Sequence, residues 1–271
     1  MEKKTLYFTK MEGLGNDYIY IDACRFQVAD PAALAVRLSD RHFGIGGDGI
    51  ILIGPSDKAD FSMRIFNADG SEGLMCGNGA RCVGKYVYDK HLIFKTDIAL
   101  ETLSGIKMLH LNVGNDGLVE SVSVDMGCYS LMEAPQEITV NGRSFRGKGI
   151  SMGNPHYILF EDDADTLDLH AYGPVIECDK AFPDRTNVEF AKVLSDGVIR
   201  MRVWERGSGI TLACGTGACA TAAAALELGL IKGSCQIIMD GGSLTIDCDK
   251  ESGKVIMTGP AVTVFEGSVE V

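Results

Sequence analysis

Hydrophobic and polar residues alternate along many short stretches of the chain, and turns rich in Gly, Asn and Asp separate these stretches. Alternation with a period of two is typical of β-strands that bury one face. Short turns favour antiparallel neighbours, so the pattern predicts a largely antiparallel sheet. The clearest strands are FSMRIFN (61–67), LHLNV (109–113), LVESVSVDM (118–126), GVIRMRVWE (197–205), CQIIMD (235–240), SLTIDCD (243–249) and KVIMTG (254–259).

Two helices are predicted by their end signals. One should begin with Asp30 as N-cap and Pro31 at its first position, and should end at Gly44. Residues 165–181 indicate a second helix, which we expect to be broken near Pro174 because proline lacks the N–H of the helical ladder.

Two further helices follow glycine-rich cysteine segments. The first, from Gly79 to about Lys90, is amphipathic, whereas residues 217–229 are nearly all alanine. A helix with methyl groups on every side offers no polar face to water, so we expect strands to surround it. The chain therefore predicts a mixed α/β fold in which a strand barrel wraps round a central helix, twice.

One displacement of 138 residues relates several motifs of the two halves. The identical positions cluster at the cysteine segments, where LMCGNGA and LACGTGA share five of seven positions. A period of this length predicts two pseudo-symmetric domains, residues 1–128 and 129–261, and a last strand, about 262–271, that returns to the first. The related pairs are Gly15-Asn16 with Gly153-Asn154, Met63-Arg64 with Met201-Arg202, and Cys76 with Cys214.

The charge balance excludes some classes of partner. The net charge is −12 and no run of Lys and Arg is present, which argues against binding nucleic acid. No apolar stretch approaches the 18 or so residues that span a bilayer, and the first residues do not resemble a signal peptide. We therefore expect a cytoplasmic protein with no membrane partner.

Nine cysteines without any CxxC spacing suit neither a disulfide framework nor a zinc site, so no metal is expected. An isolated cysteine is most often a small buried residue. We expect that role for Cys82 and Cys219 in the two helices, and for the five cysteines without glycine context, at positions 24, 128, 178, 235 and 248.

Cys76 and Cys214 differ from the others because each precedes Gly-x-Gly-Ala and a helix. A helix N-terminus favours a thiolate, and its bare N–H groups can bind a carboxylate. Inverting a stereocentre needs a base on one face of the carbon and an acid on the other. Two symmetry-related thiols that share one proton would supply that pair, which explains why the segment occurs twice.

At these residues the sequence resembles the diaminopimelate epimerase family. That resemblance implies two pseudo-symmetric α/β domains, cofactor-independent interconversion of LL- and meso-diaminopimelate for lysine and cell-wall synthesis, and a homodimer. It covers nearly the whole chain through the motifs KMEGLGND (10–17), FNADGSEGLMCGNGARC (66–82), GNPH (153–156), RTNVEF (185–190), ERGSGITLACGTGACA (205–220) and MTGPAVTVFEG (257–267).

The resemblance also implies roles for individual residues. Cys76 and Cys214 would be the two bases, and Glu205 would pair with the α-ammonium group. His156 would lie beside a catalytic cysteine, although a His after Asn-Pro is by itself more often a turn residue. Backbone groups of Gly77, Asn78, Gly215 and Thr216 would hold the reacting carboxylate, and the remaining pocket residues would be Asn16, Asn67, Asn154, Asn187 and Arg206.

Two positions depart from the family pattern. Some members carry a glutamine in the pocket where this chain has Gly49, so that contact is absent or is made by backbone. In other members a tyrosine near the C-terminus belongs to the dimer interface, and Phe265 lacks its hydroxyl group.

Two glycine-rich segments are rejected as nucleotide sites. GIGGDG (44–49) follows a helix and precedes a strand, the reverse of the dinucleotide-binding order, and GRSFRGKG (142–149) has Gly149 where a P-loop needs Ser or Thr.

Two alternative functions stay open. The first is a two-thiol racemase or epimerase that acts on another amino acid, such as proline or histidine. The second is a thiol redox or metal-carrying protein, which would join Cys76 and Cys214 in a disulfide or metal site.

Overall fold

The structure is a computed structural model that describes residues 4–271. The chain forms two compact units: unit 1 comprises Met1–Val124 with Gly259–Val271, and unit 2 comprises Asp125–Thr258. Strands make up most of the regular secondary structure, and four helices are present in the described residues, which confirms the mixed α/β prediction. The units divide four residues before the boundary expected from the repeat.

The two units repeat the same elements with the 138-residue displacement found in the sequence. Three pairs of elements match it at both ends: α1 (Pro31–Ser39) with α3 (Leu169–Glu177), α2 (Gly77–Asp89) with α4 (Gly215–Glu227), and β1 (Thr5–Gly13) with β11 (Arg143–Ser151).

Unit 1 is built on the strand order β19-β1-β2-β3-β4-β6-β7-β8. The pairs β2–β3 and β4–β6 are parallel and the other neighbours are antiparallel. Helix α1 follows β2 and packs on β3 and β4. The strands are β2 (Asn16–Asp22), β3 (Gly49–Gly54), β4 (Phe61–Asn67), β5 (Glu72–Gly73), β6 (Asp97–Thr102), β7 (Gly105–Val113), β8 (Val119–Cys128) and β19 (Val262–Glu270).

Unit 2 has the corresponding order β10-β11-β12-β13-β14-β16-β17-β18, with β10 in the place that β19 takes in unit 1. Its parallel pairs, β12–β13 and β14–β16, match those of unit 1. The strands are β9 (Ser130–Leu131), β10 (Glu137–Val140), β12 (Pro155–Phe160), β13 (Asn187–Ser195), β14 (Val198–Glu205), β15 (Gly209–Thr211), β16 (Ser234–Met239), β17 (Gly242–Cys248) and β18 (Lys254–Pro260).

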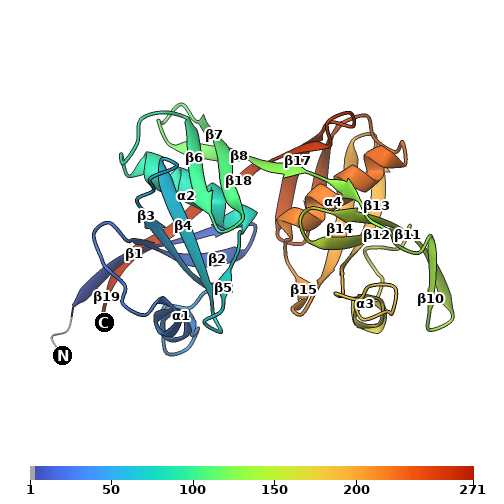
Figure 1. Cartoon of the computed structure of the whole chain (residues 1–271), viewed down its shortest axis with the longest axis horizontal. Helices are drawn as coiled ribbons and strands as arrows, with labels where there is room; N and C mark the ends of the chain where they lie inside the picture. Colours follow the sequence, from blue (N-terminus) through green and yellow to red (C-terminus); the bar gives the residue numbers. More distant parts are fainter. Residues whose placement is uncertain (1–3) are drawn as a thin grey trace. The chain divides into compact units, whose positions relative to one another are not determined.

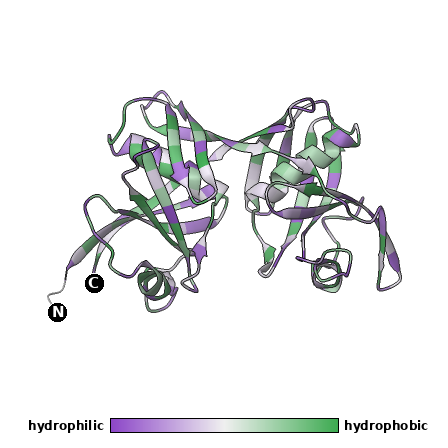
Figure 2. Cartoon of the chain, viewed as in Figure 1, coloured by the Kyte–Doolittle hydropathy of each residue, from purple (hydrophilic) through white to green (hydrophobic). Residues whose placement is uncertain are grey.

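Helix α4 runs through the middle of unit 2 (Figure 1). Every residue from Gly217 to Leu226 is buried, and the helix contacts β11, β12, β13, β14, β16 and β17. In Figure 2 it carries mainly pale and green colours, as expected for an alanine-rich helix enclosed by strands. The buried methyl groups leave room for the strands to approach closely, which explains why alanine fills this segment.

Helix α2 is also enclosed over its first turns, although its sequence is amphipathic. Arg81 is fully buried and Lys85 nearly so. Arg81 Nε donates to the carbonyl oxygen of Pro260 over 3.0 Å, and Lys85 Nζ donates to that of Val119 over 2.6 Å. These bonds give each buried cation an acceptor, which lowers the cost of placing it inside unit 1.

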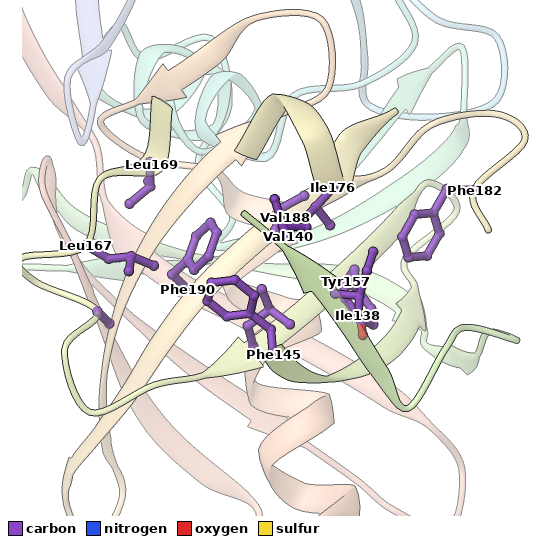
Figure 3. Packing of buried hydrophobic residues seen from close by; sticks show 12 residues of the cluster. Ile138, Val140, Phe145, Tyr157, Leu167, Leu169, Ile176, Phe182, Val188 and Phe190 are labelled. Atoms are coloured by element: carbon purple, nitrogen blue, oxygen red, sulfur yellow. The ribbon is translucent and has the colours of Figure 1, made fainter. Parts of the chain in front are cut away.

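The core of unit 2 between α3 and the sheet is aromatic (Figure 3). Phe145 packs edge to face on Phe190, with ring centroids 6.1 Å apart, and on Tyr172 at 5.0 Å. Helix α3 lies against β14, where a Cβ on Gly173 would stand 2.5 Å from the ring of Trp204. This close packing fixes α3 beside the strand that ends at Glu205.

Three expectations from the sequence are wrong. Helix α1 ends at Ser39 instead of Gly44, because the Asp40 carboxylate accepts from the N–H groups of His42 and Phe43 and starts a turn. Helix α3 continues through Pro174 to Glu177, held by its packing on Trp204. Cys24, Cys128 and Cys178 are exposed instead of buried; the other cysteines assigned to the core are buried.

Gly49 opens β3 at a point where only glycine fits. Its pair in the ladder is Asn67, and an added Cβ would stand 2.1 Å from the carbonyl oxygen of Phe66 and 2.7 Å from the ring of Tyr18. A glutamine at this position would require β4 to move.

Replacing Gly49 with alanine is expected to lower the free energy of unfolding by about 1–3 kcal/mol, because the methyl group overpacks the β3–β4 pair. Urea unfolding followed by circular dichroism measures the change. Gly73→Ala is the matched control, since a Cβ there would meet only Ile65 at an ordinary 3.7 Å. Equal stability of the two variants would contradict the steric argument.

Candidate active site

Cys76 and Cys214 occupy the same structural position in the two units. Each is the N-cap of its helix, with extended backbone angles of φ −135° and ψ 118° for Cys76 and φ −128° and ψ 109° for Cys214. Each sulfur accepts a hydrogen bond of 3.3 Å from the backbone N–H three residues on, that of Gly79 or Gly217. The thiols therefore stand in for the hydroxyl or carboxylate that usually caps a helix.

The glycines after each cysteine are required by close packing. A Cβ on Gly79 would stand 2.7 Å from Ile51 of β3, and one on Gly217 would stand 2.7 Å from Glu189 of β13 and 3.2 Å from the Cys214 sulfur. The first turn of each helix therefore lies directly against a strand. The N–H groups at positions 77, 78, 215 and 216 belong to these first turns, where an α-helix has no acceptor of its own and can bind an anion.

One predicted pocket residue of unit 1, Asn16 of β2, contacts Cys76, and another, Asn67, ends β4. The Cys76 thiol donates to Asn16 Oδ1 over 3.3 Å, and Asn16 Nδ2 donates to Asp48 over 2.8 Å. Asn67 accepts from the Tyr18 hydroxyl over 3.2 Å and donates to Ser71 over 3.1 Å. Unit 1 thus brings Asn16 to the thiol itself and holds Asn67 in a separate pair of bonds.

Asn78, in the first turn of α2, is almost fully buried. Within residues 4–271, its Oδ1 atom is buried without a hydrogen-bond partner. An unpaired buried acceptor of this kind costs stability unless a water molecule or another group pairs with it.

A chain of hydrogen bonds leads from Cys214 into the interior of unit 2. The Cys214 sulfur is 3.6 Å from the Thr216 hydroxyl, which accepts from Asn154 Nδ2 over 3.4 Å. Asn154 Oδ1 lies 3.1 Å from His156 Nε2, and His156 Nδ1 lies 2.7 Å from Glu189 Oε1. His156 belongs to β12 and is fully buried, so it is not a turn residue, and these hydrogen bonds link it to Cys214 through Asn154 and Thr216.

Carboxylates surround Cys214. Burial raises the pKa of its thiol well above the ordinary value, and the carboxylates of Glu205 and Glu189 add to the rise. The hydroxyl of Thr216 and the N–H of Gly217 act in the opposite direction. A ligand that brings a positive charge here would offset the carboxylates and make the thiolate easier to form.

Glu205 ends β14 and accepts a short hydrogen bond from the Thr211 hydroxyl. Burial raises the pKa of Glu205, and the bond from Thr211 opposes that rise. A hydrogen bond with Cys214 acts in the same direction as the bond from Thr211. A half-buried carboxylate at this place can pair with an ammonium group.

Asn187 and Arg206 are joined through backbone. Asn187 Nδ2 donates to the carbonyl oxygen of Pro155 over 2.8 Å, and its Oδ1 accepts from the N–H of Arg206 over 3.0 Å. Asn187 therefore fixes the loop after β14. The exposed guanidinium group of Arg206 uses one nitrogen on the carbonyl oxygen of Asp184, over 2.9 Å, which leaves its other donors for a carboxylate.

Sequence reasoning missed Glu189 and Asp48. The signal at Glu189 is a glutamate within the strand segment NVEFA of β13, which is buried on both faces. Asp48 lies in the glycine-rich segment GIGGDG, which drew attention only as a nucleotide motif.

Residues 4–271 contain neither a cluster of metal-binding side chains nor a helix suited to span a membrane. No group of three or more His, Cys, Asp and Glu side chains in this range could hold a metal ion. No helix in the described range is long and apolar enough to cross a membrane.

Solved structures of low sequence identity share the fold. A phenazine biosynthesis protein of the PhzF family from Bacillus anthracis superposes with a TM-score of 0.77 at 17% identity, covering 99% of this chain and 100% of that one. A hydroxyproline epimerase from Agrobacterium vitis gives 0.71 at 17% identity, covering 100% and 92%. At this identity the similarity establishes the fold alone.

Sequence comparison is far more specific. The family described as diaminopimelate epimerase matches residues 8–132 and 149–264. The diaminopimelate epimerase of Parabacteroides distasonis is 54% identical over 268 residues, 99% of each chain. That of Bacteroides thetaiotaomicron is 56% identical over 263 residues, 97% of each chain. This chain belongs to the diaminopimelate epimerase family.

Proposed function

We propose that the chain interconverts LL- and meso-diaminopimelate by proton transfer between carbon and two cysteine thiols, as a step of lysine and peptidoglycan biosynthesis. The observation that carries the proposal is the pair of helix N-termini, each capped by a cysteine sulfur. Relatives named diaminopimelate epimerase, more than 50% identical over nearly the whole chain, support the choice of substrate.

In the proposed reaction one cysteine thiolate removes the proton from the α-carbon, and the other cysteine's thiol delivers a proton to the opposite face. One S–H bond forms and one breaks, so the enzyme ends with the same number of protons but on the other sulfur. Reaction in the reverse direction restores the first state. Neither step needs a cofactor, because both protons move between sulfur and carbon.

The carbanion formed in between is stabilised by its carboxylate. Negative charge moves onto the carboxylate oxygens, where N–H groups of two helix starts favour it, each with about half an elementary charge. Glu205 pairs with the α-ammonium group, which also offsets the carboxylates that raise the pKa of Cys214. The N–H groups come from Gly77, Asn78, Gly215 and Thr216.

The distal end of the substrate carries a second ammonium and a second carboxylate. The free donors of Arg206 suit that carboxylate, and Asn187 holds the Arg206 backbone in place. His156 acts through Asn154 on the Cys214 side. The other side chains proposed for this pocket are Asn16, Asn67 and Asn154.

A homodimer in the cytoplasm is the proposed state of the protein. Strand β19 pairs with β1 and leaves Val262, Val264 and Phe265 about half exposed. Phe265 packs edge to face on Phe8, 5.9 Å between ring centroids, so it is held in place without a hydroxyl group. An apolar strand face of this kind is typical of an interface between copies.

Incubation with LL-diaminopimelate in deuterated water under reducing conditions is expected to place deuterium at the α-carbon and to produce the meso isomer, because the proton delivered comes from a thiol that exchanges with solvent. Nuclear magnetic resonance and chiral chromatography measure both. Exchange with proline or histidine but not with diaminopimelate would select the racemase alternative. Activity that survives oxidation to a Cys76–Cys214 disulfide would contradict the two-thiol mechanism.

Cys76→Ala and Cys214→Ala are each expected to lower kcat by at least about 10²–10⁴-fold, since each removes a general acid or base. Circular dichroism should stay unchanged. The matched control is Cys24→Ala, because Cys24 is an exposed cysteine outside both helix caps. Near wild-type turnover in either cap variant would show that the assignment of the two bases is wrong.

Glu205→Gln is expected to make Cys214 react faster with iodoacetamide at a given pH. The carboxylate raises the pKa of the Cys214 thiol, so its removal lowers that pKa and increases the thiolate fraction. Epimerisation should nevertheless fall, since the ammonium group loses its partner. Peptide-resolved mass spectrometry measures alkylation, and Glu251→Gln, at an exposed position, is the control. An unchanged alkylation rate of Cys214 would show that Glu205 does not influence the pKa of the thiol.

A further inference from the structure

The side chain of Asn16 has one orientation available beside Cys76. Its Nδ2 donates to Asp48 Oδ2 over 2.8 Å, and its Oδ1 accepts from the Cys76 sulfur over 3.3 Å. A carboxylate can only accept, so the amide N–H must face Asp48 and the amide oxygen must face the thiol. An oxygen acceptor stabilises S–H and repels a thiolate.

Asp48 is itself held firmly, although it lies in a loop. Its Oδ1 accepts from Arg41 over 3.0 Å, and its Oδ2 also accepts from the N–H of Asp17 over 3.2 Å. Arg41 makes two bonds to the Asp17 carboxylate, 2.7 and 3.1 Å, and the buried Lys10 pairs with the same carboxylate at 2.6 Å. Both oxygens of Asp48 therefore have fixed partners, and Asn16 is one of them.

The equivalent asparagine of unit 2 is turned the other way. Asn154 directs its Nδ2 to the Thr216 hydroxyl and its Oδ1 to His156. The 138-residue displacement places Thr186, not a carboxylate, at the position of Asp48. Each sulfur accepts one backbone N–H at 3.3 Å, but the side chains beside the two sulfurs differ. Cys76 has the amide oxygen of Asn16, whereas Cys214 has the Thr216 hydroxyl group and the carboxylates of Glu205 and Glu189.

Other titratable groups that interact with Cys76 are Tyr20 on β2 and Cys82 on α2, and Arg81 on α2 and Glu12 on β1 act in turn on Cys82. Burial raises the pKa of Tyr20 well above its usual value and that of Cys82 to about 11, so neither carries charge at neutral pH. The remaining two have opposite charges. A substitution at position 48 leaves all of these groups in place, so a change in the orientation of Asn16 can be measured by its effect on Cys76.

We propose that Asp48 is a positioning residue for the reaction: by fixing the amide of Asn16 it keeps the proton on Cys76 in the unliganded protein. In the proposed function, on which this step rests, Asp48 therefore favours the protonated form of Cys76 before a ligand binds. The repeat supplies the two thiols, and unit 2 has no counterpart of Asp48, because Thr186 occupies that position.

The test is the pH dependence of alkylation of Cys76 by iodoacetamide, resolved by peptide mass spectrometry in the unliganded protein. Asp48→Ala frees the Asn16 amide to turn its N–H to the sulfur. We expect the midpoint of the profile to fall by about half to one pH unit, which is about threefold to tenfold faster reaction below the midpoint. The limiting rate at high pH should not change.

Asp48→Asn separates orientation from charge. It removes the same charge as Asp48→Ala but keeps an oxygen that can accept from Asn16 Nδ2, so its midpoint should stay near that of the wild type. Equal shifts in both variants would assign the effect to charge, and no shift in Asp48→Ala would exclude the role. A higher limiting rate without a midpoint shift would indicate loosening of the loop and would also overturn the proposal.

Asp57→Ala, an exposed aspartate in unit 1, controls for general charge effects. The alkylation measurement contains no substrate. If the chain fails to epimerise diaminopimelate but shows the expected shift, the proposed function is wrong and the role of Asp48 stands. If the enzyme is active and the midpoint is unchanged, the proposed function stands and the role of Asp48 is wrong.

Discussion

In both units the candidate site depends on a sulfur atom that caps a helix. The N-cap position forces Cys76 and Cys214 into extended backbone and places each sulfur on the N–H of the first turn. The same first turn packs on a strand so closely that Gly79 and Gly217 cannot be replaced without movement. The capping sulfur, the N–H groups of the first turn and the strand contact are therefore a single local structure, which can be duplicated as a unit.

Duplication preserved the backbone and changed the surroundings of the sulfur. Helices α2 and α4 keep their 138-residue displacement at both ends. The side chains around the two sulfurs are not repeated: Cys76 faces an amide oxygen, whereas Cys214 faces a hydroxyl group and two carboxylates. Two thiols in identical surroundings would have the same tendency to be protonated. The asymmetry of the side chains therefore suits a reaction that needs one acid and one base.

Much of this structure is predictable from sequence because its signals are local. Period-two alternation locates the strands, the alanine run locates the enclosed helix α4, and glycines after a cysteine indicate the helix cap. What could not be predicted depends on tertiary contacts. Glu189 meets His156 only because β12 and β13 pair in parallel, and α3 passes through Pro174 because Trp204 packs against its neighbour Gly173. The sequence around a residue does not indicate which residue of a neighbouring strand it will contact.

The carboxylates near Cys214 explain how such a thiol can be both stable and reactive. In the absence of a ligand, burial and the negative charges of Glu205 and Glu189 keep the sulfur protonated, and a neutral thiol is less prone to alkylation and oxidation. A bound ammonium group neutralises part of that field and admits the thiolate. Under the proposed function, a ligand with an ammonium group would therefore favour the thiolate more than a carboxylic acid without one.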